Sequence, residues 1–186
     1  FFNTAGPVKS NKHYCLPPLE RFDADEVLSL IDQEKYFILH APRQTGKTTC
    51  LLALMDYINQ EGKYKSLYFN VEPAQSARED VKRGVRAILS GIATSAELLI
   101  DDPFVTNNWK DILDHHGEDA ALKETLTRWA KDSSAPLILL IDEIDSLIGD
   151  TLISVLRQLR AGYTQRPEIF PQSIILCGVR DIRDYR

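Results

Sequence analysis

The residue types best suited to chemistry occur in one short segment, residues 41–48. Apart from Ala41 at its first position, this segment fits the pattern of Gly, four residues, Gly-Lys and then Ser or Thr, whose backbone amides curl around phosphate groups. Gly46 lets the backbone approach closely, Lys47 reaches the outer phosphates, and the Thr48 hydroxyl is a magnesium ligand. The expected nucleotide-binding residues are Ala41, Pro42, Arg43, Gln44, Thr45, Gly46, Lys47, Thr48 and Thr49.

A second group of reactive side chains follows the most apolar stretch of the chain, residues 137–141. A carboxylate at the carboxyl end of a buried parallel strand lies at the crevice where open α/β sheets bind ligands. We therefore expect Asp142 to hold Mg²⁺, mostly through water, and Glu143 to act as the general base that activates an attacking water. A water-activating glutamate favours a hydrolase over a small-molecule kinase. The alternative is that Asp142, Glu143 and Asp145 only begin a solvated turn.

Weaker candidates lie at the ends of two other apolar runs. Arg180 follows the last run and could stabilise charge on the γ-phosphate in the transition state, so it joins Glu143 and Lys47 as a catalytic candidate. The alternative for Arg180 is a solvated basic turn. Asn70 and Glu72, near the end of an earlier run, could also face the γ-phosphate.

The elements that position these residues follow from hydrophobic periodicity. Short apolar runs predict strands at 36–39, 66–71, 137–141 and 173–177, and helical spacing predicts helices between them. One helix begins at about 24, one ends at Gly62, one opens with a capping box at Ser76 and Glu79, and others cover about 104–115, 118–131 and 151–162. Strands that are apolar throughout are typical of a parallel sheet covered by helices on both faces. The phosphate-binding pattern lies between a strand and a helix, as its mechanism requires, which disfavours a chance match.

Composition narrows the class of protein. A chain of 186 residues with 44% hydrophobic content fits one globular domain, and its formal charge of −5 disfavours nucleic-acid binding by this segment alone. No apolar run approaches the roughly 20 residues that span a bilayer. The three cysteines, Cys15, Cys50 and Cys177, share no metal-type spacing and indicate free thiols in a reducing compartment. We therefore expect a cytoplasmic protein that does not enter a membrane.

Taken together, these residues resemble the additional-strand, catalytic-glutamate division of P-loop NTPases. Residues 40–49 are similar to the bacterial AAA-like ATP-binding proteins, relatives of the AAA+ and STAND ATPases, and residues 2–7 and 13–14 resemble the lead-in of that family. The resemblance implies a three-layer α/β fold with a parallel sheet in the order 5-1-4-3-2, followed by a helical lid. Four strands are expected here, so the fifth strand and the lid are expected beyond Arg186. Residues 1–33 are then an N-terminal arm and short helix, and residues 34–186 a truncated ATPase core.

The resemblance also implies ATP and Mg²⁺ as cofactors, and a homo-oligomer as a possible assembly. The function it implies is Mg-dependent ATP hydrolysis that drives a conformational or assembly switch. Two alternatives remain open. One is a switch or scaffold that binds ATP without hydrolysing it, and the other is the ATPase module of a DNA-directed initiator or transposition protein.

Overall fold

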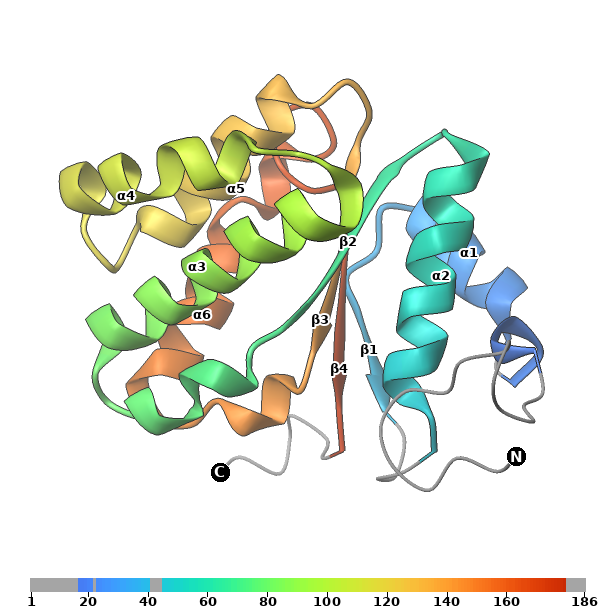
Figure 1. The fold of residues 1–186 in the computed structure, drawn as a ribbon, viewed down its shortest axis with the longest axis horizontal. Coiled ribbons are helices and arrows are strands. Elements are labelled where there is room, and N and C mark those ends of the chain that lie inside the picture. The colour runs from blue at the N-terminus through green and yellow to red at the C-terminus, as the bar shows by residue number, and fades with distance from the viewer. Residues whose placement is uncertain (1–16, 22, 41–44, 180–186) are drawn as a thin grey trace.

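A parallel β-sheet forms the middle layer of the protein (Figure 1). The computed structural model describes residues 17–21, 23–40 and 45–179. Within these ranges the sheet has four strands in the order β1-β4-β3-β2, all paired in parallel. The strands are β1 (Phe37–His40), β2 (Lys65–Asn70), β3 (Leu137–Asp142) and β4 (Ser173–Gly178). The expected parallel sheet and the order of its first four strands are confirmed, while the expected fifth strand and lid stay predictions.

Helices cover both faces of the sheet, as the apolar strands predict. The smaller group packs on one face and consists of α1 (Ala24–Asp32) and α2 (Lys47–Glu61). The larger group packs on the other and consists of α3 (Val81–Ile100), α4 (Phe104–His116), α5 (Ala121–Asp132) and α6 (Gly149–Ala161). Strand β3 is buried at every position. Its side chains alternate between the two faces, with Ile138 and Leu140 in the smaller core and Leu139 and Ile141 in the larger.

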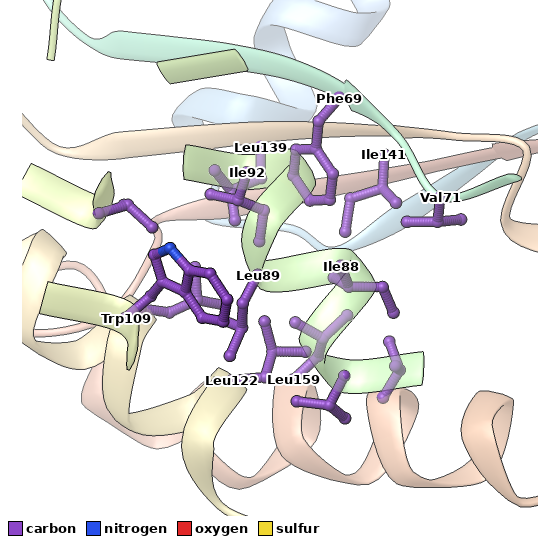
Figure 2. Packing of buried hydrophobic residues seen from close by; sticks show 14 of the residues in the cluster. Phe69, Val71, Ile88, Leu89, Ile92, Trp109, Leu122, Leu139, Ile141 and Leu159 are labelled. Carbon is purple, nitrogen blue, oxygen red and sulfur yellow. The ribbon is translucent and has the colours of Figure 1, made fainter. Parts of the chain in front are cut away.

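The larger core explains why four helices gather on one face. Figure 2 shows Phe69, Leu139 and Ile141 of the sheet facing Ile88, Leu89 and Ile92 of α3. Further side chains from the outer helices complete the cluster, among them Trp109 of α4, Leu122 of α5 and Leu159 of α6. Burial of each large apolar side chain contributes about 1.5–3 kcal/mol. Residues 72–132, which include α3, α4 and α5, are therefore part of the layer that forms the larger core.

The start of α3 differs from the capping box expected at Ser76 and Glu79. Ser76 lies in a 3₁₀ segment (Glu72–Ala77), and α3 begins at Val81. Asp80 is the N-cap residue, and its carboxylate accepts a hydrogen bond from the Arg83 amide at 3.0 Å. Asp is among the preferred N-cap residues, so its side chain takes the role that the pattern assigned to Ser76.

Helix α5 is capped from a neighbouring helix. It begins at Ala121, later than the expected 118, and Ala120 at its N-cap has no side-chain acceptor. Gln158 of α6, which is 3% exposed, supplies one instead, because its Oε1 accepts from the Leu122 and Lys123 amides at 2.9 and 3.2 Å. Its Nε2 donates to the Glu118 carbonyl at 2.8 Å. The buried side-chain amide of Gln158 therefore joins α6 to the first turn of α5.

Asp102 anchors the opposite end of the sheet from the candidate site. Its carboxylate accepts hydrogen bonds from Lys65 Nζ at 2.8 Å, Trp129 Nε1 at 2.9 Å and the Phe104 amide at 3.0 Å. Burial acts to raise the pKa of Asp102, but the hydrogen bonds from Lys65, Trp129 and Phe104 outweigh it and hold the pKa below its ordinary value. The ionised carboxylate thus ties β2 to α4 and α5.

Candidate functional site

The chemically suggestive residues meet at the carboxyl edge of the sheet. Because all four strands run in parallel, His40, Asn70, Asp142 and Gly178 end their strands at the same edge. Register pairs Asn70 with Asp142 and His40 with Gly178. The first turn of α2 lies at this edge too, next to the end of β1 (Figure 1). This is the edge at which open α/β sheets bind ligands.

The phosphate-binding pattern leads directly into α2. Gly46 is the N-cap residue, with φ 80° and ψ 25°, a left-handed conformation that glycine adopts without strain. The helix begins at Lys47, so the amides of its first turn have no acceptors within the helix, and its dipole favours anions there. Of the expected nucleotide-binding residues, Thr45, Gly46, Lys47, Thr48 and Thr49 are described. Ala41, Pro42, Arg43 and Gln44 lie outside the described residues.

The structure brings together the two residues expected to hold the metal. Thr48 Oγ1 donates a hydrogen bond of 2.8 Å to Asp142 Oδ2, across 94 positions of the sequence. Asp142 is 0% exposed, and its Oδ1 accepts from the Glu143 amide at 3.0 Å. A buried carboxylate requires such donors, because burial without them is costly. The Thr48–Asp142 pair is therefore a defined arrangement in the folded chain.

Glu143, the expected general base, has an unusual backbone. Its φ of 58° and ψ of 38° place a non-glycine residue in the left-handed region, where such residues are uncommon and occur often at functional sites. Burial raises the pKa of Glu143 above its ordinary value, and the negative charges of Asp142 and Asp145 raise it further. Lys47 lowers the same pKa, so Lys47 and Glu143 influence one another electrostatically. The structure thus brings both described catalytic candidates to one region.

Asp145 connects the acidic loop to β4. Its Oδ2 accepts a hydrogen bond of 3.0 Å from the Val179 amide, directly after the strand. Gly178 is packed against the Asp145 carboxylate, since a Cβ at this glycine would lie 2.8 Å from Oδ1. Asp145 is thus more than the start of a solvated turn. The third catalytic candidate, Arg180, follows immediately but lies outside the described residues.

Two weaker candidates share a turn at the end of β2. Asn70 Oδ1 accepts a hydrogen bond of 2.7 Å from the Glu72 amide, and Glu72 is exposed. The Glu72 charge is among those that raise the pKa of Glu143. The position of this turn is compatible with the expected role near a γ-phosphate, which stays a prediction.

Tyr68 is a further residue of the site, and it was not expected from the sequence. Its hydroxyl donates a hydrogen bond of 3.0 Å to Asp142 Oδ2, the oxygen that also accepts from Thr48. Burial, followed by the nearby charge of Asp142, raises the pKa of Tyr68 above its ordinary value, so the hydroxyl remains a protonated donor. One signal was available in the sequence, a phenol between the apolar residues Leu67 and Phe69 of a predicted strand. Without the strand register, this signal does not identify Asp142 as the partner.

Cys177 also lies in this region, one residue before the end of β4. It is 1% exposed and a free thiol, as expected. Burial, with a smaller contribution from Asp142, raises the pKa of Cys177 to about 12. The thiol is therefore protonated at neutral pH. Cys50 is a partly buried free thiol, and Cys15 lies outside the described residues.

Comparisons with known proteins agree with this architecture. A family model for the AAA domain matches residues 31–185. A search of curated proteins finds no match. The helices in the described ranges include none with the length and apolar character that a membrane crossing requires.

Solved structures with the same fold include Drosophila ORC bound to DNA, with a TM-score of 0.51, 14% identity and coverage of 99% of this chain and 48% of that chain. A second structure, Drosophila ORC bound to poly(dA/dT) DNA and Cdc6, matches with a TM-score of 0.54 and 11% identity. This match covers 87% of the present chain and 24% of the other chain. The chain thus spans about half and about a quarter of the chains it matches. At these identities the likeness concerns the fold, and a bacterial origin stays an expectation. With a matching family model over most of its length and this sheet order, the chain belongs to the AAA domain family and is a P-loop ATPase core of that family.

Proposed function

We propose that this chain binds ATP with Mg²⁺ and hydrolyses it, and that hydrolysis drives a conformational or assembly switch. The observation that carries the proposal is the 2.8 Å hydrogen bond from Thr48 Oγ1 to Asp142 Oδ2. It joins the last residue of the phosphate-binding pattern to a buried carboxylate at the carboxyl end of β3. P-loop NTPases hold Mg²⁺ with this pair of residue types.

The donor set fits magnesium. Mg²⁺ prefers oxygen ligands in octahedral geometry, keeps several waters, and is commonly held by one or two carboxylates together with substrate phosphates. Asp142 and Thr48 offer a carboxylate and a hydroxyl of this kind, and a dication beside Asp142 compensates its buried charge. When bound, Mg²⁺ supplies the positive charge that offsets the charge developing on the phosphate oxygens.

The phosphates are proposed to bind at the start of α2. The amides of residues 45–49 and the helix dipole attract the anion, and the Lys47 ammonium pairs with the outer phosphates. Ala41, Pro42, Arg43 and Gln44 are proposed to complete the cradle. Gly46 adopts a left-handed conformation that would strain a residue with a Cβ, and without a Cβ its backbone can approach the phosphates closely.

Glu143 is proposed as the general base. A carboxylate whose pKa is raised toward neutrality is a stronger base that remains ionised at the working pH. Burial and the charges of Asp142 and Asp145 act on Glu143 in this direction. Water attacks the γ-phosphorus, its proton passes to the Glu143 carboxylate, and the bond to the bridging oxygen breaks to leave ADP. Arg180 is proposed to stabilise charge on the γ-phosphate in the transition state.

The coupled event is proposed to be assembly or rearrangement of protein subunits. The solved structures of similar fold are of ORC bound to DNA, one of them together with Cdc6. The formal charge of −5 does not favour DNA binding by this segment alone, so we propose subunit contacts as the output, with a homo-oligomer as the simplest case.

The test is titration of the protein with a fluorescent ATP analogue and Mg²⁺, with phosphate release from ATP followed in parallel. Lys47→Ala should lose binding, whereas Lys131→Ala, an exposed lysine in the last turn of α5, should bind like the wild type. Glu143→Gln should keep binding and lose about 10²–10⁴-fold in turnover, the usual contribution of a general base. A folded wild type that does not bind Mg-ATP refutes the proposal. Binding with equal phosphate release by wild type and Glu143→Gln favours the non-hydrolysing switch.

A further inference from the structure

The hydrogen bonds of the Asp142 carboxylate are distributed unevenly between its two oxygens. An ionised carboxylate has about four acceptor sites, two on each oxygen. Oδ2 accepts from two hydroxyls, Thr48 at 2.8 Å and Tyr68 at 3.0 Å. Oδ1 accepts from the Glu143 amide at 3.0 Å. The two hydroxyls therefore fill Oδ2, whereas Oδ1 accepts one backbone amide. The buried Cys177 thiol, a weak donor, also interacts with this carboxylate.

The register of β2 and β3 brings the Tyr68 hydroxyl to this carboxylate. Tyr68 pairs with Leu140, and Asn70 pairs with Asp142, so Tyr68 lies one pleat before the end of β2. Leu140 belongs to the core between the sheet and α2, and Tyr68 packs against the same core. Tyr68 and Asp142 therefore share the face of the sheet that α2 covers, and the first turn of α2 carries Thr48. The two hydroxyls approach Oδ2 from different elements.

We infer that Tyr68 is a positioning residue of the metal site, which fixes the Asp142 carboxylate so that Oδ2 faces the two hydroxyls and Oδ1 faces a metal-bound water. The inference rests on the proposed function, since it concerns the same Mg²⁺. A metal-bound water is a hydrogen-bond donor, and the second acceptor site of Oδ1 suits it. Thr48 donates its proton to Oδ2, which leaves its oxygen lone pairs for the metal.

Loss of the Tyr68 hydroxyl should weaken metal binding without affecting the phosphate cradle. In Tyr68→Phe the carboxylate keeps the Thr48 and Glu143 donors but loses one of the two that orient Oδ2. Mg²⁺ requires near-ideal octahedral geometry and is sensitive to the placement of its ligands. A hydrogen bond to a charged group corresponds to about tenfold or more in an equilibrium. We therefore expect the half-saturating Mg²⁺ concentration to rise about tenfold.

A matched control exists in the same chain. The Tyr64 hydroxyl also donates to an aspartate, Asp32 Oδ1 at 2.6 Å, but this pair is exposed and joins the turn before β2 to the end of α1. Tyr64→Phe therefore removes a phenol–carboxylate hydrogen bond away from the proposed metal site. Its half-saturating Mg²⁺ concentration should equal that of the wild type.

The experiment measures binding of a fluorescent ATP analogue to the whole chain, first in EDTA and then as Mg²⁺ is added. Tyr68→Phe should match the wild type in EDTA and need about tenfold more Mg²⁺ for half-saturation. Titration with Mn²⁺ followed by electron paramagnetic resonance gives a second readout that does not depend on turnover. A reversibly unfolded fraction would also raise the apparent dissociation constant of the nucleotide in EDTA, so equal affinity in EDTA excludes partial unfolding as the cause of the shift.

The outcomes separate the two proposals. If the wild type and Tyr68→Phe need the same Mg²⁺ concentration, or if Tyr64→Phe shifts as much as Tyr68→Phe, the role of Tyr68 is refuted while the proposed function stands. If the wild type does not bind the nucleotide, or binds it regardless of Mg²⁺, the proposed function fails and the role of Tyr68 fails with it.

Discussion

Substitution of Gly178 by alanine tests the contact between β4 and the acidic loop. A Cβ at Gly178 would lie 2.8 Å from Asp145 Oδ1 and 3.1 Å from its Cγ, closer than ordinary contacts. The strand or the carboxylate must therefore move. The carboxylate is held by the hydrogen bond of 3.0 Å from the Val179 amide, so its displacement weakens that bond.

Three effects set the size of the change. Overpacking a well-packed site costs about 1–3 kcal/mol. A hydrogen bond to a charged group contributes about 1.5–3 kcal/mol, and weakening the bond loses part of this contribution. Replacing glycine with alanine stabilises by about 0.4–1 kcal/mol when the backbone conformation suits alanine, because the unfolded chain loses freedom. The steric and hydrogen-bond costs outweigh this gain, and we expect Gly178→Ala to lower the free energy of unfolding by about 2 kcal/mol.

The assay is thermal unfolding followed by circular dichroism. For a domain of this size a loss of about 2 kcal/mol lowers the Tm by roughly 4–8 °C. Gly91→Ala is the matched control, since the nearest atom to its Cβ is the Asn70 carbonyl oxygen at 4.0 Å and the site lies inside α3. It should gain about 0.5–1 kcal/mol from helix propensity. Adding Asp145→Ala should remove most of the Gly178→Ala penalty. The reasoning is refuted if Gly178→Ala melts at or above the wild-type Tm, or if its penalty is unchanged without the Asp145 carboxylate.

Three further substitutions test the packing that supports the site. Asp102→Asn should lower the free energy of unfolding at pH 7, and the loss should be smaller at pH 3. Burial acts to raise the pKa of Asp102, but the hydrogen bonds from Lys65, Trp129 and Phe104 outweigh it and hold the pKa below its ordinary value of 3.8. The stability from this lowered pKa is present above 3.8 and is lost as the pH falls through the folded value, so urea unfolding should show the two proteins converging in acid. Gly162→Ala should destabilise by at least about 1–3 kcal/mol, since its Cβ would lie 2.2 Å from a ring carbon of the fully buried Phe170, and an unchanged Tm would contradict this contact. Gln158→Leu should cost about 1–3 kcal/mol by leaving the first turn of α5 without its acceptor, and urea unfolding with no loss would count against that cap.

The elements were predictable where apolar periodicity is strong. All four expected strands occur within a residue or two of their expected bounds, and β3, which is buried at every position, is a run of apolar residues up to Asp142. The start of α3 was not predictable, since Ser76 and Asp80 both carry N-cap side chains and the fold selects Asp80. The cap of α5 was not predictable either, because its acceptor, Gln158, comes from another helix.

The candidate site was predictable to the extent that its residues follow recognisable local patterns. Thr48 and Asp142 were expected as a pair, and the structure joins them at 2.8 Å. Tyr68 was missed because its relation to Asp142 depends on strand register, which places two residues 74 positions apart in hydrogen-bond contact. The Asp145–Val179 contact likewise spans 34 positions and involves a backbone amide, which carries no signal in the sequence.

The order of the strands also has a consequence for how the chain folds during synthesis. Strand β1 joins the sheet through β4 alone among the described strands, and the hydrogen bond from Ser173 Oγ to the Lys35 carbonyl beside this pairing spans 138 positions. Closing so long a loop costs entropy that no local contact recovers, so β2 and β3 can pair before β1 has a neighbour. Ribosomes add about 5–20 residues per second, so the nascent chain carries an undocked β1 for several seconds. The strand that leads into the phosphate-binding pattern is thus made early and docks late, and until then its apolar side chains are exposed to chaperones and to other nascent chains.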